Sequence, residues 1–284
     1  MKKSFTNPLL FISFFFISIF QSLTLYSEDK STIRYLHPIF ENVVIQKDIE
    51  FAEVTNFQGK TGNLQLDIYS PEGDKETHRP VILWFHGGGF RTGNDKKQDY
   101  IVKFSKEFAK RGYVCASINY RVRENPKDDK AGTMNDALKD AMAGLNWIRS
   151  NKEKLGIDPK QIIVGGGSAG GMLTVNFGCR DNTPADPWDK TGIIGLVNLW
   201  GSPEPAYLFF TIDKNDPPMI LIHGTEDKIL PFEYAVALEK LLETNHIRHE
   251  FVPLEGAGHT PMKQYDAFAG KISEFLFSLL NPKK

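Results

Sequence analysis

Residues 161–171 read QIIVGGGSAGG, and residues 166–170 within them match the pattern G-x-S-x-G around Ser168. The apolar run before this motif predicts a strand, and GMLTVNFG after it predicts a helix. A turn this tight places Ser168 in a strained backbone conformation, with glycines on both sides to prevent collisions. The backbone N–H groups of the helix N-terminus then face any negative charge that develops. The motif predicts a nucleophilic serine. A glycine-rich turn with an ordinary, non-catalytic serine would show the same sequence pattern.

Outward from this motif, predicted strands and helices alternate along the chain. Apolar runs predict strands at 81–85, 113–120, 161–166, 193–200, 219–223 and 249–255, and helical spacing predicts helices at 98–111, 135–152, 170–179, 231–244 and 261–280. This repetition is typical of an α/β fold with a mostly parallel central sheet and helices on both faces. Residues 64–70 alternate apolar and polar side chains, which predicts an antiparallel edge strand.

A second glycine-rich segment, HGGGF at residues 86–90, follows directly after the predicted strand 81–85. Three consecutive glycines let the backbone approach a ligand closely. In acyl transfer such N–H groups bind an oxyanion together with the N–H of the residue after the nucleophile. We therefore expect N–H groups of this glycine run and of Ala169 to form an oxyanion hole, and we expect His86 to be structural. The alternative is a flexible turn.

A nucleophilic serine needs a base, and the base needs a carboxylate that orients it. Two loops after late strands offer them in the order acid, then histidine. Asp227 and its neighbour Glu226 follow the strand at 219–223, and His259 follows the strand at 249–255. We expect structural or solvated roles for the remaining histidines, which are His37, His78, His86, His223, His246 and His249.

Composition excludes several classes of function for this chain of 284 residues. The formal net charge is -1, with no basic stripe, so a nucleic-acid partner is not expected. No metal cluster, P-loop or dinucleotide motif is present, so no cofactor is implied. Cys115 and Cys179 fall in a predicted strand and helix, and we expect two buried free thiols.

The first residues are typical of an export signal. Lys2 and Lys3 precede an apolar run at 9–20, which is too short to span a membrane. We expect a signal peptide over residues 1–27 with an uncertain cleavage site, although an uncleaved anchor is the alternative. Residues 28–284 would then be a single exported domain, periplasmic or extracellular, with no stable membrane span.

At this point the sequence resembles the α/β-hydrolase-fold serine esterases. It is similar to the acetyl-esterase and feruloyl-esterase-like carboxylesterases and to the hormone-sensitive-lipase type. The resemblance runs from residue 67 to the C-terminus and rests on HGGGF, INYRV, LNWIRSNKEKLGIDPKQIIVGGGSAGG, ILIHGTEDKILPF and LEGAGH.

The resemblance implies a role for each motif residue. Ser168 would be the nucleophile, Asp227 the acid and His259 the base, with Gly87, Gly88 and Ala169 as oxyanion donors. Asp227 is preferred to Glu226 because it fits the pattern H-G-x-x-D-x-x-x-P. Many hormone-sensitive-lipase-type members carry an acidic residue where this chain has Gly167, and their YRLAPE is here YRVREN. Both departures favour the feruloyl-esterase and acetyl-esterase branch.

The segment between the predicted strands 193–200 and 219–223 indicates which size of substrate the site accepts. Residues 201–218 are proline-rich and too short for a large lid, so we expect a minimal cap and an open, shallow pocket. Tyr207, Phe209 and Phe210 would line an apolar wall or belong to the core. These features favour a short acyl group on a bulky alcohol such as a sugar.

Two other functions remain open at the level of sequence. The first is a serine peptidase of the prolyl-oligopeptidase type, which usually carries a propeller that the residues before the sheet cannot build. The second is a non-catalytic binding protein on the same fold.

Overall fold

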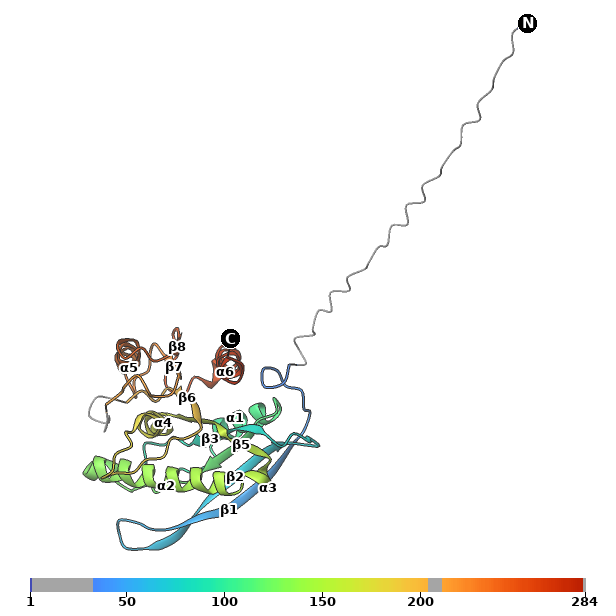
Figure 1. The fold of residues 1–284 in the computed structure, drawn as a ribbon. Helices are drawn as coiled ribbons and strands as arrows, with labels where there is room; N and C mark the ends of the chain where they lie inside the picture. Colours follow the sequence, from blue (N-terminus) through green and yellow to red (C-terminus); the bar gives the residue numbers. More distant parts are fainter. Residues whose placement is uncertain (2–32, 204–210, 283–284) are drawn as a thin grey trace.

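The computed structural model describes residues 1, 33–203 and 211–282. Continuous apolar runs form the centre of its one eight-stranded sheet (Figure 1). The strand order is β1-β2-β4-β3-β5-β6-β7-β8. The strands are β1 (Val43–Thr55), β2 (Thr61–Pro71), β3 (Arg79–Phe85), β4 (Val114–Ile118), β5 (Ile157–Gly167), β6 (Ile193–Leu199), β7 (Met219–Gly224) and β8 (His249–Leu254). From β4 to β8 neighbouring strands are parallel, whereas β1 pairs with β2 and β2 with β4 in antiparallel fashion.

Helices cover both faces of the sheet. They are α1 (Asp99–Ala109), α2 (Lys130–Ser150), α3 (Lys152–Leu155), α4 (Ala169–Cys179), α5 (Phe232–Thr244) and α6 (Tyr265–Leu280), with short 3₁₀ turns at Pro126–Asp129 and Met262–Gln264. Alternate residues of each central strand face opposite ways. Val81 and Leu83 of β3 therefore pack in one apolar cluster with α2, α4 and α5, while Trp84 packs in the other with α1 and α6.

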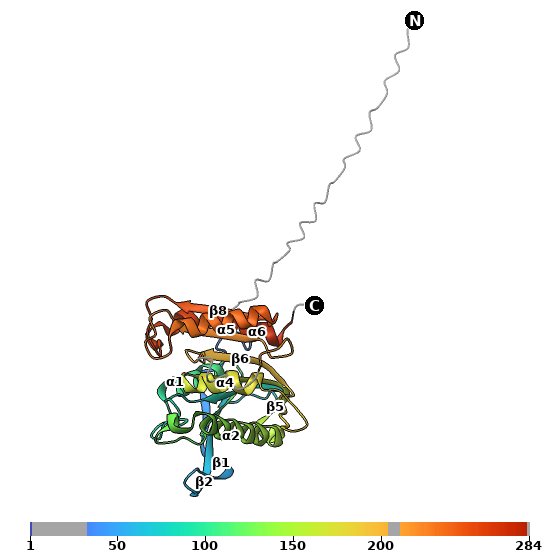
Figure 2. The same cartoon turned by 90° about the vertical axis from the view of Figure 1, so that its left-hand side faces the viewer.

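The predicted α/β fold is confirmed, and each predicted strand and helix appears within a few residues of its expected bounds. One prediction was wrong: residues 64–70 do not form an edge strand. They lie in β2, which β1 covers on its outer side, and Leu66 and Ile68 are fully buried. The β1–β2 pair extends beyond the body of the sheet in both views, while β8 with α5 and α6 lies at the opposite end (Figures 1 and 2).

Several predictions concern residues that the structure does not describe. The expected signal peptide falls almost entirely in residues 2–32, and Tyr207, Phe209 and Phe210 fall in residues 204–210, so both sets lie outside the described residues. Within the described ranges no helix is both long and apolar enough to cross a membrane. Cys115 and Cys179 are free and buried, as expected.

The turn between β5 and α4 depends on backbones that approach each other closely. A Cβ atom at Gly166 would lie 2.7 Å from the carbonyl oxygen of Phe85. A Cβ atom at Gly170 would lie 2.6 Å from the carbonyl oxygen of His86 and still closer to that of Phe85. Because these neighbours are backbone atoms of a central strand and its loop, they cannot move aside. The end of β3 therefore packs directly against the start of α4.

We predict opposite effects on stability for alanine at two helical glycines. Gly170→Ala should lower the free energy of unfolding by roughly 3 kcal/mol, because the new methyl group collides with backbone. Gly270→Ala on the exposed face of α6, where a Cβ atom meets nothing within 4 Å, should raise it by about 0.5–1 kcal/mol. Urea denaturation of both variants measures the difference. Equal effects would contradict the close packing at the turn.

Candidate active site

Ser168 lies between the end of β5 and the start of α4 with φ 56° and ψ -121°. Positive φ is strained for a residue with a Cβ atom, and such strain is typical of functional sites. Hydrogen bonds hold the backbone there: the Ser168 N–H donates to Leu199 O at 2.9 Å, and Met172 N–H donates to Ser168 O at 3.0 Å. The sequence prediction of a strained turn is confirmed.

A chain of hydrogen bonds connects the three residues predicted to act together. His259 Nε2 lies 2.9 Å from Ser168 Oγ, and His259 Nδ1 lies 2.7 Å from Asp227 Oδ2. A carboxylate only accepts hydrogen bonds, so the Nδ1–H of His259 donates to Asp227. This arrangement leaves Nε2 able to accept the hydroxyl proton of Ser168, as a general base must.

The acid loop shows why Asp227, and not Glu226, contacts His259. Asp227 is 6% exposed, and its Oδ1 accepts hydrogen bonds from the N–H groups of Ile229 at 2.8 Å and Leu230 at 3.0 Å. These bonds fix the carboxylate so that Oδ2 faces the imidazole. Glu226 is exposed, although its backbone N–H ties the loop to Ala257 O.

His223 is buried and contacts this loop, in keeping with the structural role expected for it. Its Nε2–H donates to Leu230 O at 2.9 Å, and the same nitrogen lies 3.4 Å from Asp227 Oδ2. Burial is the main cause that lowers the pKa of His223, so the neutral imidazole is favoured. The His223 ring therefore supports the acid loop as a neutral group.

The predicted oxyanion hole needs one correction. The Gly87 N–H donates to Gln98 Oε1 at 2.9 Å, so it does not face an oxyanion beside Ser168. Gly89 and Ala169 instead line the hollow that contains Ser168, while Gly88 adopts φ 100° between Gly87 and Gly89. Sequence reasoning missed Gly89, although the glycine run contained it. No sequence signal indicated that Gln98 would bind Gly87.

His86 is structural, as expected. Its ring stacks on Tyr120 with centroids 4.2 Å apart, and its Nδ1–H donates to Gly87 O at 2.8 Å. Burial lowers the pKa of His86 to about 4, so the ring stays neutral near neutral pH. The Tyr120 hydroxyl also donates to His86 O at 2.6 Å, which anchors the start of the glycine loop.

Gly167 stands where related esterases often carry an acid, and the structure shows what fills that space. A Cβ atom at Gly167 would lie 2.8 Å from the Tyr100 ring and 3.0 Å from Trp200 Nε1. The Tyr100 hydroxyl donates to Gly167 O at 3.2 Å. Two large aromatic side chains therefore occupy the region beside the nucleophile, and an acidic side chain has no room there.

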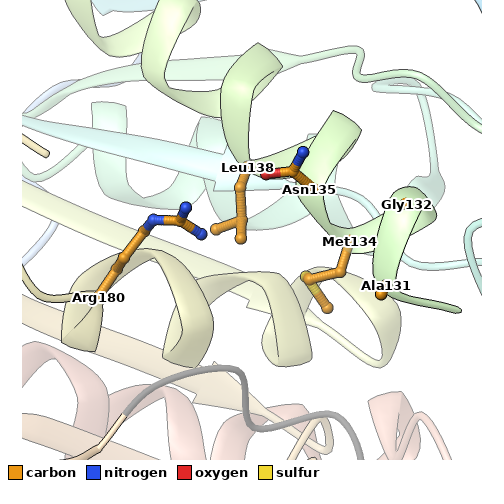
Figure 3. Close-up of a pocket in the computed structure, with 6 residues that line it drawn as sticks. All are labelled: Ala131, Gly132, Met134, Asn135, Leu138 and Arg180. Carbon is orange, nitrogen blue, oxygen red and sulfur yellow. The ribbon is translucent and has the colours of Figure 1, made fainter. Parts of the chain in front are cut away.

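Ser168 opens into a hollow of about 880 Å³ between the glycine loop, the start of α2 and the acid loop. A second hollow of about 400 Å³ lies between α2 and the end of α4, where Arg180 reaches toward Leu138 (Figure 3). Met134 lines both hollows, so they flank the same side chain. Among the described residues, none before Gly89 lines the larger hollow.

One group of side chains in the described ranges has the composition of a metal site. Ligand atoms of Glu239, Glu243 and His249 lie within 4.8 Å of one another. Glu239 and Glu243 lie in α5 and His249 begins β8, whereas His259 follows the other end of that strand. It therefore has no part in the Ser168 site.

Comparison with known proteins finds esterases among the chains that are similar to this one. The family model BD-FAE matches residues 66–190. Esterase LipC of Mycobacterium tuberculosis is 28% identical over 233 residues, which cover 68% of this chain and 56% of that protein. Gut esterase 1 of Caenorhabditis elegans is 34% identical over 141 residues, which cover 46% of this chain and 24% of that protein. The chain thus spans about half or less of the length of these curated relatives.

A solved structure matches over almost its whole length. Esterase 2 of the planctomycete Thermogutta terrifontis superposes with a TM-score of 0.66 at 26% identity, covering 88% of this chain and 98% of that chain. The shared architecture includes the parallel sheet that carries Ser168, Asp227 and His259 at the ends of its strands. The chain has the α/β-hydrolase fold and is similar to esterases in both sequence and structure.

Proposed function

We propose that this chain is a serine carboxylic-ester hydrolase that works through an acyl-enzyme. One observation carries the proposal: Ser168, His259 and Asp227 form a continuous hydrogen-bonded chain beside an open hollow. The esterase relatives support the same class of reaction. Inhibitor complexes support the serine mechanism by analogy, since one solved structure is of Thermogutta terrifontis esterase 2 phosphorylated by paraoxon.

The reaction follows from the positions of the side chains. Ser168 Oγ attacks the ester carbonyl carbon while His259 Nε2 takes the hydroxyl proton, and Asp227 stabilises the imidazolium that results. The N–H groups of Ala169 and Gly89 are the proposed donors to the oxyanion, with Gly88 as a further candidate. His259 then protonates the alcohol as it leaves. Water attacks the acyl-enzyme by the same route and regenerates Ser168.

We further propose short-chain acyl esters of bulky alcohols, including acylated carbohydrates, as the substrates. Two other structures of Thermogutta terrifontis esterase 2 hold propionate and butyrate, which are short carboxylates. The second hollow beside Met134 adds space for a large alcohol. Both features favour a short acyl group over a long lipid chain.

The first prediction tests the nucleophile. Ser168→Ala should lower kcat for p-nitrophenyl acetate by a factor on the order of 10⁶, because the covalent step is lost. A fluorophosphonate probe should label the wild-type chain and leave the variant unlabelled. Circular dichroism would check that the variant is folded. Unchanged ester hydrolysis by the folded variant would overturn the assignment, and failure of the wild type to react would favour a non-catalytic protein.

The second prediction separates the two neighbouring carboxylates. Asp227→Asn should lower kcat by roughly 10⁴, because an amide no longer stabilises the imidazolium. Glu226→Gln is the matched control and should change kcat little, since that side chain is exposed. Steady-state kinetics on the same ester measure both. The opposite ranking would transfer the role to Glu226.

The third prediction concerns acyl-chain length. Each methylene gains about 0.8 kcal/mol only where a groove buries it. No residue before Gly89 that the structure describes lines the hollow, so residues 33–88 supply no such groove. We expect kcat/KM for p-nitrophenyl esters to peak between acetyl and butyryl and to fall by octanoyl, with no rate jump on an emulsion. A maximum at octanoyl or longer would identify a lipase instead.

A further inference from the structure

The hollow beside Ser168 has a surface divided by chemistry. Its buried lining is mostly apolar, with Phe90, Pro126, Met134, Ala169 and Met172. Its exposed lining carries three cations, Arg91, Lys127 and Lys228, beside Gly89 and Ile229, and Lys130 is half-buried. Of the described residues that line this hollow, none is acidic.

From this division we propose that the natural ester carries a negative charge on its alcohol part. The inference rests on the proposed function and narrows its substrate class to acyl esters of acidic alcohols, such as a sugar with a carboxylate group. Neutral acyl groups suit the apolar floor, where Ser168 bonds the reacting carbon and the Ala169 N–H faces its oxygen. The alcohol departs toward solvent, so it lies against the exposed side chains of Arg91, Lys127 and Lys228, which we call the cationic rim.

The two carboxylates at Asp129 and Asp136 are paired with residues other than Arg91, Lys127 and Lys228. Asp129 accepts from Gly132 N–H and pairs with Arg123 at 2.7 Å. Asp136 pairs with both Arg121 and Arg123. Asp129 and Asp136 are therefore engaged by arginines that do not line the hollow, whereas Asp128 is exposed beside Lys127. The cations of the rim come from three separate segments that the fold brings together.

The size of the effect follows from Coulomb's law. Opposite unit charges about 7 Å apart in water change an equilibrium roughly threefold, and less as salt screens them. Three exposed cations acting together should therefore raise kcat/KM for an anionic ester by a factor on the order of ten at low ionic strength. The preference should shrink in high salt, whereas a preference due to shape would persist.

The test compares two esters with the same acyl group and nearly the same shape. These are p-acetoxybenzoate, which is anionic, and p-acetoxybenzamide, which is neutral, each corrected for its rate of spontaneous hydrolysis. The anionic-to-neutral ratio of kcat/KM is measured for wild type and for the triple variant Arg91→Gln, Lys127→Gln, Lys228→Gln. A charge-conserving variant, Arg91→Lys, Lys127→Arg, Lys228→Arg, separates charge from shape. Lys160→Gln, at the far end of β5, is the matched control.

We expect the triple glutamine variant to lower this ratio about tenfold at low salt, and the charge-conserving variant to keep it. Lys160→Gln should leave both rates as in wild type. An unchanged ratio in the glutamine variant, or an equal loss in Lys160→Gln, would overturn the charge preference while hydrolysis of the neutral ester left the esterase assignment intact. If neither ester is hydrolysed and a fluorophosphonate leaves Ser168 unlabelled, the proposed function itself fails, and this inference with it.

A second pair of esters tests whether the charge that the rim recognises lies on the acyl part or on the alcohol part of the substrate. The succinate monoester of p-nitrophenol carries its charge on the acyl part, and p-nitrophenyl levulinate is its neutral counterpart. We expect the glutamine variant to change the ratio for this pair much less than for the first pair. A charge effect confined to the succinate pair would overturn the assignment of the charge to the alcohol.

Discussion

The contact of Gly170 with the carbonyl groups of Phe85 and His86 is the constraint on which the rest of the site depends. It brings the start of α4 against the end of β3, while Phe85 and Gly166 pair in adjacent parallel strands. The nucleophile and the glycine loop therefore occupy fixed positions relative to each other before any substrate binds. Such preorganisation is what makes backbone N–H groups effective at stabilising an oxyanion.

The glycine loop is also held from its far side. Lys96 is fully buried, and its Nζ lies 2.5 Å from Asp67 Oδ1 and 2.7 Å from Asp48 Oδ1. The Ser117 hydroxyl donates to Lys96 O at 2.8 Å. A buried charge is tolerated only when it is paired in this way. The antiparallel strands β1 and β2 thus support the site indirectly, because they carry the carboxylates that hold the loop.

The parallel strands, the tight turn at Ser168 and the set of Ser168, Asp227 and His259 were predicted from the sequence because each leaves a local signal. Apolar runs mark strands covered on both faces, and glycines mark close backbone contacts. The outer strand β1 left no clean signal, since irregularities after Gln46 and Glu50 break its alternation. The bond between Gln98 and Gly87 was also beyond prediction from sequence, because it depends on where a polar side chain of a neighbouring loop points. The cationic rim shows the same limit, since its members are far apart in the chain.

The position of His259 has a consequence for how the protein responds to heat. The base follows β8, an edge strand whose residues are mostly only half-buried, whereas Ser168 follows β5 at the centre of the sheet. Edge elements open locally at a lower free energy than the whole fold. Opening of β8 would withdraw the base while the serine stayed in place. Catalysis is therefore expected to fade, reversibly, at temperatures where the core of the sheet is still intact.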